Sequence, residues 1–126
     1  MTSTVTNHKT TVVLGASPNP GRYSYEAVHR LHAKGIRVVP VGIRQGEIDG
    51  IDIKIGQPAE EEVDTVTLYL NAKRQKEYYD YILELNPRRI IFNPGTENAE
   101  LMNLARERGI EPVIACTLVM LSTGEY

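Results

Sequence analysis

The sequence contains little cysteine and has no long apolar run. Among its 126 residues Cys116 is the one cysteine, so no disulfide can form within the chain, which fits a reducing compartment. Residues 1–9 are polar and lack the apolar segment of a signal peptide. No apolar stretch approaches the length of about 20 residues that a membrane-spanning helix needs. We therefore expect a cytoplasmic protein without a membrane segment.

A strong excess of charge is also missing. The formal net charge is −2, which argues against the basic field typical of general nucleic-acid or membrane binding. His29 and His32 lie three residues apart, but no further ligands accompany them, so no metal site is expected. The length predicts a single domain over 10–126, preceded by a flexible tail over 1–9.

The clearest pattern in the chain lies between Thr11 and Leu31. An apolar run ends at Gly15, a loop rich in proline, glycine and asparagine follows over 16–24, and apolar residues then recur at helical spacing. Backbone N–H groups at a helix N-terminus favour anions, so we predict that residues 16–24 bind a phosphate or diphosphate. The alternative is a turn that needs glycine and proline only for its geometry.

Strands and helices alternate through the chain, which is typical of an α/β fold with right-handed crossovers. We predict a Rossmann-like, doubly wound, mainly parallel sheet of five to six strands, with helices on both faces in three layers. The main strands are expected in the order 2-1-3-4-5, with a short strand near Ile53 at the edge beside the second. Strands are predicted at 11–16, 36–41, 51–55, 65–70, 89–93 and 111–116, helices at 24–34, 72–85 and 98–108, and one helical turn at 58–62.

Local signals set several of these boundaries. Ser24 and Asn71 are predicted N-caps of the first and second helices, and Gly35 follows the end of the first. Residues 42–50 are predicted to form a loop. The tail, 117–126, carries a run of apolar residues from Leu118 to Leu121 that is costly to expose, so either a homodimer or docking on its own domain is expected to cover it.

The predicted strand order also locates a binding site. Ligands of such sheets bind outside the carboxyl ends of the strands, at the point where the strand order reverses. Here the order reverses between the strands that contain Val13 and Val66. Four loops are expected to meet there, namely residues 16–22, 41–45, 70–74 and 93–97.

The basic residues near this point favour a phosphorylated ribose. NAD binding normally needs an acid at the end of the second strand, but this chain has Arg44 there, which suits the ribose phosphate of NADP or coenzyme A. Arg22 is placed to pair with a diphosphate. Lys73 and Arg74 lie in the first turn of a helix, against the dipole preference, which makes sense beside an anion. Solvated surface side chains are the alternative for this pair.

Three motifs carry a resemblance to a known family. They are Gly-Ala-Ser-Pro-Asn-Pro-Gly-Arg-Tyr-Ser over 15–24, Val-Val-Pro-Val-Gly over 38–42, and Asn-Pro-Gly-Thr-Glu-Asn over 93–98, followed by Cys116 after the last strand. Together the chain resembles the stand-alone CoA-binding domain family, which is similar to the N-terminal CoA-binding domain of the succinyl-CoA synthetase α subunit. The synthetase's phosphorylated histidine belongs to a second domain with no counterpart here, so the resemblance implies binding and not ligase activity.

The resemblance assigns parts of the ligand to particular segments. It implies that the first loop holds the phosphate and adenosine end, that Val41 and Arg44 neighbour the ribose phosphate, and that residues 93–95 face the pantetheine arm. The candidate binding residues are Gly15, Ala16, Ser17, Pro18, Asn19, Gly21, Arg22, Tyr23, Ser24, Val41, Arg44, Asn71, Lys73, Arg74, Asn93, Pro94 and Gly95.

Signals for catalysis are weaker. Cys116 has no histidine partner nearby in sequence and is typical of a small core residue, and the acidic run 60–62 is typical of a solvated face. No nucleophile, base and orienting group occur together. We therefore expect a non-catalytic protein that binds CoA or acyl-CoA. A small NADP-linked enzyme or redox partner using the same loop, and an interaction or sensor protein with a vestigial pocket, remain the alternatives.

Overall fold

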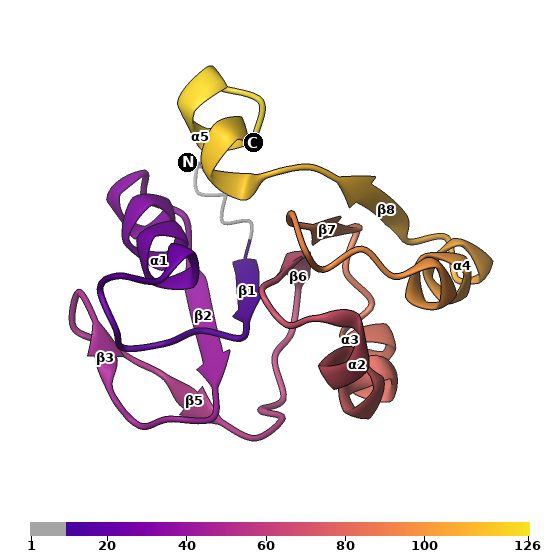
Figure 1. Cartoon of the computed structure of the whole chain (residues 1–126), viewed down its shortest axis with the longest axis horizontal. Coiled ribbons are helices and arrows are strands. Elements are labelled where there is room, and N and C mark those ends of the chain that lie inside the picture. The colour runs from indigo at the N-terminus through magenta and orange to yellow at the C-terminus, as the bar shows by residue number, and fades with distance from the viewer. Residues whose placement is uncertain (1–9) are drawn as a thin grey trace, which may run out of the picture.

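The fold is a six-stranded parallel sheet with helices on both faces (Figure 1). The computed structural model describes residues 10–126, so the flexible tail predicted at 1–9 lies outside the described residues. The strand order is β5-β2-β1-β6-β7-β8, which confirms the predicted order with the short strand at one edge. The strands are β1 (Thr10–Leu14), β2 (Val38–Gly42), β5 (Lys54–Ile55), β6 (Val63–Leu68), β7 (Arg89–Phe92) and β8 (Glu111–Ile114).

Within residues 10–126, five α-helices surround the sheet on its two faces. They are α1 (Tyr23–Ala33), α2 (Ala72–Gln75), α3 (Tyr79–Leu85), α4 (Ala99–Glu107) and α5 (Thr117–Thr123). On one face α1 and α5 pack against the sheet, while α3 and α4 bury a larger apolar cluster on the other face (Figure 1). The predicted three-layer, Rossmann-like α/β fold is thereby confirmed.

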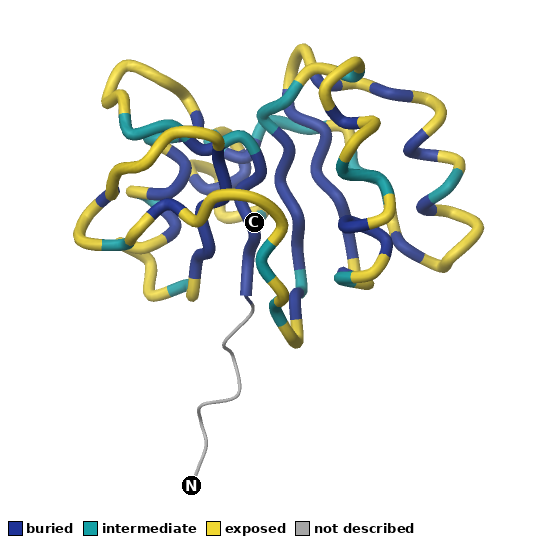
Figure 2. The backbone as a smooth tube through the Cα atoms, turned by 90° about the horizontal axis from the view of Figure 1, so that it is seen from below, coloured by how far each residue is buried: buried dark blue, intermediate teal, exposed yellow. Residues whose placement is uncertain are grey.

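The central strands are buried on both faces, which explains their continuous apolar sequences. All five residues of β1 are buried, and the strands form the dark core of the tube in Figure 2. Within β1 the side chains of Val12 and Leu14 belong to the cluster under α3 and α4, while Val13 belongs to the cluster under α1. Because β1 pairs with β2 on one side and with β6 on the other, its end lies in the middle of the sheet.

The first helix begins one residue earlier than predicted. Its N-cap is Arg22 and not Ser24, because the preceding turn closes sooner than the sequence suggested. The Asn19 side chain accepts the Gly21 N–H at 2.9 Å, and the Asn19 carbonyl accepts the Arg22 N–H at 3.0 Å. Ser24 is instead a buried residue of the first turn. Gly35 follows the end of the helix, as predicted.

The end of the predicted loop at 42–50 and the start of the strand predicted at 51–55 form a small hairpin, so only Lys54–Ile55 of that strand joins the main sheet as β5. Strands β3 (Glu47–Ile48) and β4 (Ile51–Asp52) pair antiparallel around Asp49 and Gly50, which both have positive φ. An Asp-Gly pair is the usual signal of such a turn, but two-residue strands are too short for their alternation to be recognised. The Asp49 carboxylate lies 2.7 Å from Nδ1 of His29, which ties the hairpin to α1.

The helical turn predicted at 58–62 is wrong, because the structure shows no helix there. The segment has no regular secondary structure and is held by tertiary contacts: Arg37 lies 3.2 Å from Glu60 Oε1, and the Lys54 ammonium donates to Glu60 Oε2 at 2.7 Å. The Glu60 side chain is only 7% exposed, so it is not part of a solvated face. Burial alone raises the pKa of this carboxyl, but the hydrogen bonds from Lys54 and Arg37 outweigh burial and leave the pKa below its ordinary value.

The single helix predicted at 72–85 is divided in the structure. Asn71 caps α2 as predicted, accepting the Arg74 N–H at 2.9 Å. A 3₁₀ turn at Lys76–Tyr78 then separates α2 from α3, and Tyr78 has a φ of −108° and a ψ of 2°. The segment contains neither proline nor glycine. Tertiary contacts, such as the Tyr81 hydroxyl donating to the Pro58 carbonyl at 2.6 Å, therefore override local propensity.

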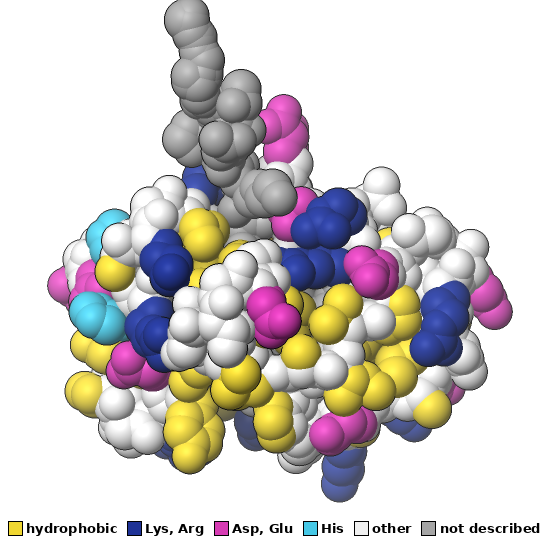
Figure 3. Space-filling model, turned by 90° about the horizontal axis from the view of Figure 1, so that it is seen from above, with side chains coloured by type: hydrophobic (Ala, Val, Ile, Leu, Met, Phe, Trp, Pro, Cys, Tyr) yellow, Lys and Arg dark blue, Asp and Glu magenta, His cyan; other side chains and the backbone are white. Residues whose placement is uncertain are grey.

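The C-terminal tail forms helix α5, which docks on its own domain. Met120 and Leu121 are buried, whereas Val119 remains 56% exposed. The last residue, Tyr126, also packs inward: the Arg89 guanidinium carbon lies 4.6 Å from its ring centroid, and its hydroxyl hydrogen-bonds to Thr11. Figure 3 looks onto this face and shows hydrophobic side chains gathered around α5. Docking on the chain itself thus covers much of the apolar run.

Candidate functional site

A cavity of about 650 Å³ opens at the carboxyl ends of the strands, where the strand order reverses between β1 and β6. This volume falls within the range of about 300–1,000 Å³ that small-molecule sites occupy. Residues from all four predicted loops line it. The predicted site residues on its wall are Gly15, Ala16, Ser17, Asn19, Arg22, Tyr23, Ser24, Val41, Arg44, Asn71, Arg74, Pro94 and Gly95.

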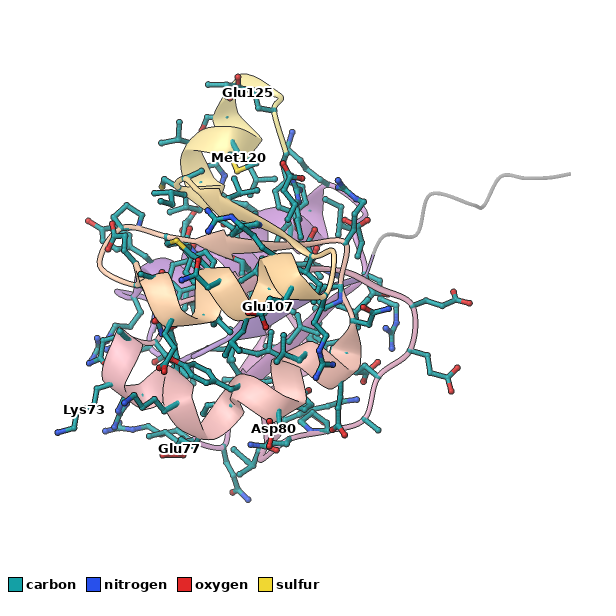
Figure 4. The ribbon with its side chains drawn as sticks, turned by 90° about the vertical axis from the view of Figure 1, so that its right-hand side faces the viewer. Lys73, Glu77, Asp80, Glu107, Met120 and Glu125 are labelled. Carbon is teal, nitrogen blue, oxygen red and sulfur yellow. The ribbon has the colours of Figure 1, made fainter. Side chains whose placement is uncertain are left out.

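Three predicted site residues lie beside this cavity without lining it. Pro18 packs against Gly46, where an added Cβ would lie 2.5 Å from the Pro18 Cβ. Gly21 is exposed in the turn that Asn19 closes. Figure 4 shows the Lys73 side chain extending away from α2 into solvent. Lys73 thus does not line the cavity, and its role in binding stays a prediction.

A fourth predicted residue, Asn93, is buried and serves the fold. Its side-chain N–H groups donate to Thr67 Oγ1 and to the Leu68 carbonyl, both at 2.7 Å, and its Oδ1 accepts the Thr117 N–H at 2.8 Å. Both N–H groups and the oxygen of the Asn93 amide are therefore hydrogen-bonded, and these bonds connect β6, β7 and the start of α5. Asn93 therefore supports the loop that follows it, and Pro94 and Gly95 take its predicted place on the cavity wall.

The first loop is fixed tightly to the end of β2. The Gly15 and Ala16 N–H groups both donate to the Val41 carbonyl, at 2.8 and 2.9 Å. Gly15 has a φ of +99°, a conformation that side chains with a Cβ rarely adopt. A Cβ on Gly42 would lie 2.2 Å from the Ala16 carbonyl oxygen. The floor of the cavity thus requires glycine at both positions.

Fewer loop amides are available than the sequence suggested. The Ser17, Tyr23 and Ser24 N–H groups have no partner within the described part of the chain, and all three residues line the cavity. Tyr23 and Ser24 are the first two residues of α1, where such groups are free to bind an anion. The loop amides that are already bonded within the protein are those of Gly15, Ala16, Asn19, Gly21 and Arg22.

The charge on the cavity wall is of one sign. Arg22, Arg44 and Arg74 line it, are exposed, and form no ion pair within residues 10–126. The lining residues include no aspartate or glutamate. A chain whose net charge is −2 therefore concentrates positive charge around this cavity. Anions are attracted to such a site, and guanidinium groups match phosphate geometry.

Six lining residues were not named among the candidate binding residues, although four of them lie in loops that were predicted to meet there. Tyr69 follows β6 directly, so its position after a buried strand was the available signal, whereas Tyr78 ends the 3₁₀ turn between α2 and α3. The Tyr69 hydroxyl is buried beside Thr117, and burial raises the pKa of this phenol above its ordinary value. The six additional residues are Gly42, Ile43, Tyr69, Leu70, Tyr78 and Thr96.

Comparisons with known proteins agree with this geometry. A family model described as a CoA binding domain matches residues 9–122. The chain belongs to the CoA binding domain family. The resemblance that the loop motifs suggested is thereby confirmed. Among curated proteins no match is found.

Several solved structures share the fold of this CoA binding domain. The crystal structure of an uncharacterized protein is 53% identical over 94% of this chain and 98% of the other, with a TM-score of 0.91. A hypothetical protein from Pyrococcus horikoshii OT3 is 25% identical over 94% of this chain and 84% of its own, with a TM-score of 0.82. A Thermus thermophilus protein, 24% identical over 94% of this chain and 91% of its own, also has a TM-score of 0.82 and shares the fold.

Between residues 10 and 126, no helix is both long and apolar enough to span a membrane.

Proposed function

We propose that this protein binds coenzyme A or an acyl-CoA in the cavity at the carboxyl edge of its sheet. The observation that carries the proposal is the cavity wall itself, which holds three arginines and no carboxylate. Membership of the CoA binding domain family supports the same ligand. The diphosphate is assigned to the Ser17, Tyr23 and Ser24 amides together with the Arg22 side chain.

The remaining parts of the ligand follow from the order of the loops around the cavity. Arg44, just beyond β2, is assigned to the phosphate on the ribose, and the exposed Tyr23 ring, beside the first loop, is available to stack on the adenine. The loops after β6 and β7 are left for the pantetheine arm. The absence of an acid among the residues that line the cavity disfavours NAD, whose ribose hydroxyls normally pair with a carboxylate.

The same wall supports a binding role over a catalytic one. Its residues include no histidine, cysteine, lysine or carboxylate, so the Ser17 and Ser24 hydroxyls that line it have no general base on the wall to activate them. We therefore propose that the protein holds its ligand without converting it. If the bound ligand reacts, the reactive group must come from a partner protein or from a second substrate.

A calorimetric titration against CoA, acetyl-CoA, dephospho-CoA, NADP and NAD tests this function. We expect CoA and acetyl-CoA to bind with similar affinity, and dephospho-CoA to bind more weakly because it lacks the phosphate assigned to Arg44. We expect NADP and NAD to bind weakest. Acetyl-CoA should be recovered intact after incubation. Tighter binding of NADP than of CoA, or no binding of any of these compounds, would contradict the proposal.

A further inference from the structure

Gln75 joins the two loops that form one end of the cavity. Its side chain is fully buried at the end of α2. One Nε2 hydrogen is donated to the Leu70 carbonyl and the other to the Thr96 carbonyl, both at 2.8 Å. Leu70 follows β6 and Thr96 follows β7, and both residues line the cavity, whereas Gln75 does not. A single side chain behind the wall thus connects two segments that are 26 residues apart in sequence.

The position of the Gln75 amide is itself fixed. Asn98 donates from Nδ2 to Gln75 Oε1 at 2.8 Å, and its Oδ1 caps α4 by accepting the Leu101 N–H at 3.2 Å. The Tyr79 hydroxyl accepts from Asn98 at 2.8 Å and donates to Glu100 at 3.0 Å. A buried amide that uses both donors and its oxygen has little freedom to rotate, and such a network favours one arrangement of its surroundings.

We propose that Gln75 is a positioning residue that sets the separation of these two loops and thereby how tightly the cavity holds the pantetheine arm of CoA. This inference rests on the proposed CoA-binding function. Gln75 occupies both carbonyls with hydrogen bonds, and Leu70 and Pro94 contribute apolar side chains to the cavity wall at this end. Without its two hydrogen bonds, both carbonyls lose their partners and the loops are free to separate or to turn toward the ligand.

The test compares CoA with adenosine 3′,5′-bisphosphate, which lacks the pantetheine arm together with one phosphate of the diphosphate. In the Q75M variant, methionine keeps the length of the side chain but makes neither hydrogen bond. Titration calorimetry should show at least a tenfold loss of CoA affinity, with the affinity for the bisphosphate within twofold of wild type. Gln57 offers a matched control, because it also donates to a backbone carbonyl, that of Glu77 at 3.0 Å, but does not line the cavity. Q57M should leave both affinities within twofold of wild type.

A second variant covers the case in which Q75M fails to fold. Q75E keeps the acceptor for Asn98, and when protonated it can donate to one of the two carbonyls. At pH 5.5 its CoA affinity should fall between those of wild type and Q75M, and at pH 8, where an ionised carboxylate repels both carbonyl oxygens, its affinity relative to wild type should be weaker.

Three results would overturn the inference. They are an unchanged CoA affinity in Q75M, an equal loss of affinity for both ligands in Q75M and Q75E, and wild-type protein that binds CoA no more tightly than the bisphosphate. Wild-type protein that binds neither ligand would instead contradict the proposed function, so the two failures are distinguishable.

Discussion

Replacing Gly42 by alanine should lower the free energy of unfolding by roughly 3–5 kcal/mol. The added Cβ would lie 2.2 Å from the Ala16 carbonyl oxygen, which belongs to backbone and cannot rotate aside. Overpacking of this kind costs about 1–3 kcal/mol. The displaced loop would also lose the two hydrogen bonds from Gly15 and Ala16 to the Val41 carbonyl, at about 1 kcal/mol each. Urea denaturation followed by circular dichroism measures the change.

Gly21 offers a matched control for this substitution. It lies in the first loop, which packs against the end of β2, and an added Cβ there meets only the Asn19 side-chain oxygen at 3.4 Å, an ordinary contact. G21A should therefore change the free energy of unfolding by less than about 1 kcal/mol. If G42A were as stable as G21A, the close approach of the first loop to β2 would not be a requirement of the fold.

Replacing Arg22 by alanine should weaken CoA binding about 10- to 100-fold, the equivalent of about 1.5–3 kcal/mol for a hydrogen bond to a charged group. The Arg22 side chain is exposed and makes no hydrogen bond or ion pair within residues 10–126, so its removal costs the folded protein little. Stability should stay within about 0.5 kcal/mol of wild type. Titration calorimetry and urea denaturation on the same preparation separate the two effects.

Two further variants refine this measurement. R22K keeps the charge but loses the planar donor pair, so its affinity should lie between those of wild type and R22A. R106A removes the same charge from α4, where the guanidinium donates to Asn103 and does not line the cavity. It should leave CoA affinity within about twofold, because exposed charges more than about 10 Å apart are largely screened at 0.1 M salt. Equal losses in R22A and R106A would mean that net charge, and not a local contact, governs binding.

The sequence was sufficient to predict the fold because its strongest signals are local. Continuous apolar strands, the Asn71 cap and the glycine after the first helix all act within a few residues, and each is found in the structure. The strand order followed from these elements and from the handedness of crossovers. The position of the cavity followed in turn from the strand order.

The errors arose where distant contacts override local preference. The segment at 58–62 was predicted as a helical turn, but it is irregular in the structure, where Arg37 and Lys54 bind the Glu60 carboxylate. The second helix breaks at Tyr78 although its sequence contains no breaker. Neither effect is visible in a window of a few residues, because the partners lie many positions away in the sequence.

The predicted site shows the same limit. The sequence identified which loops meet but not which of their groups are free: most amides of the first loop are already bonded, and Asn93 faces inward. Gln75 was not among the predicted site residues, because a glutamine within a helix carries no signal that it is buried. Its importance follows only from the two carbonyls that it contacts.

The most direct test of the binding site is an NMR titration of the backbone amides with CoA. The proposed site depends on three free N–H groups, those of Ser17, Tyr23 and Ser24, next to the Arg22 side chain. We expect these three amide signals to shift most on addition of CoA. Largest shifts at residues away from the cavity, such as those around Arg88 and Arg108, or no shifts at saturating CoA, would contradict the assignment of the diphosphate to the start of α1.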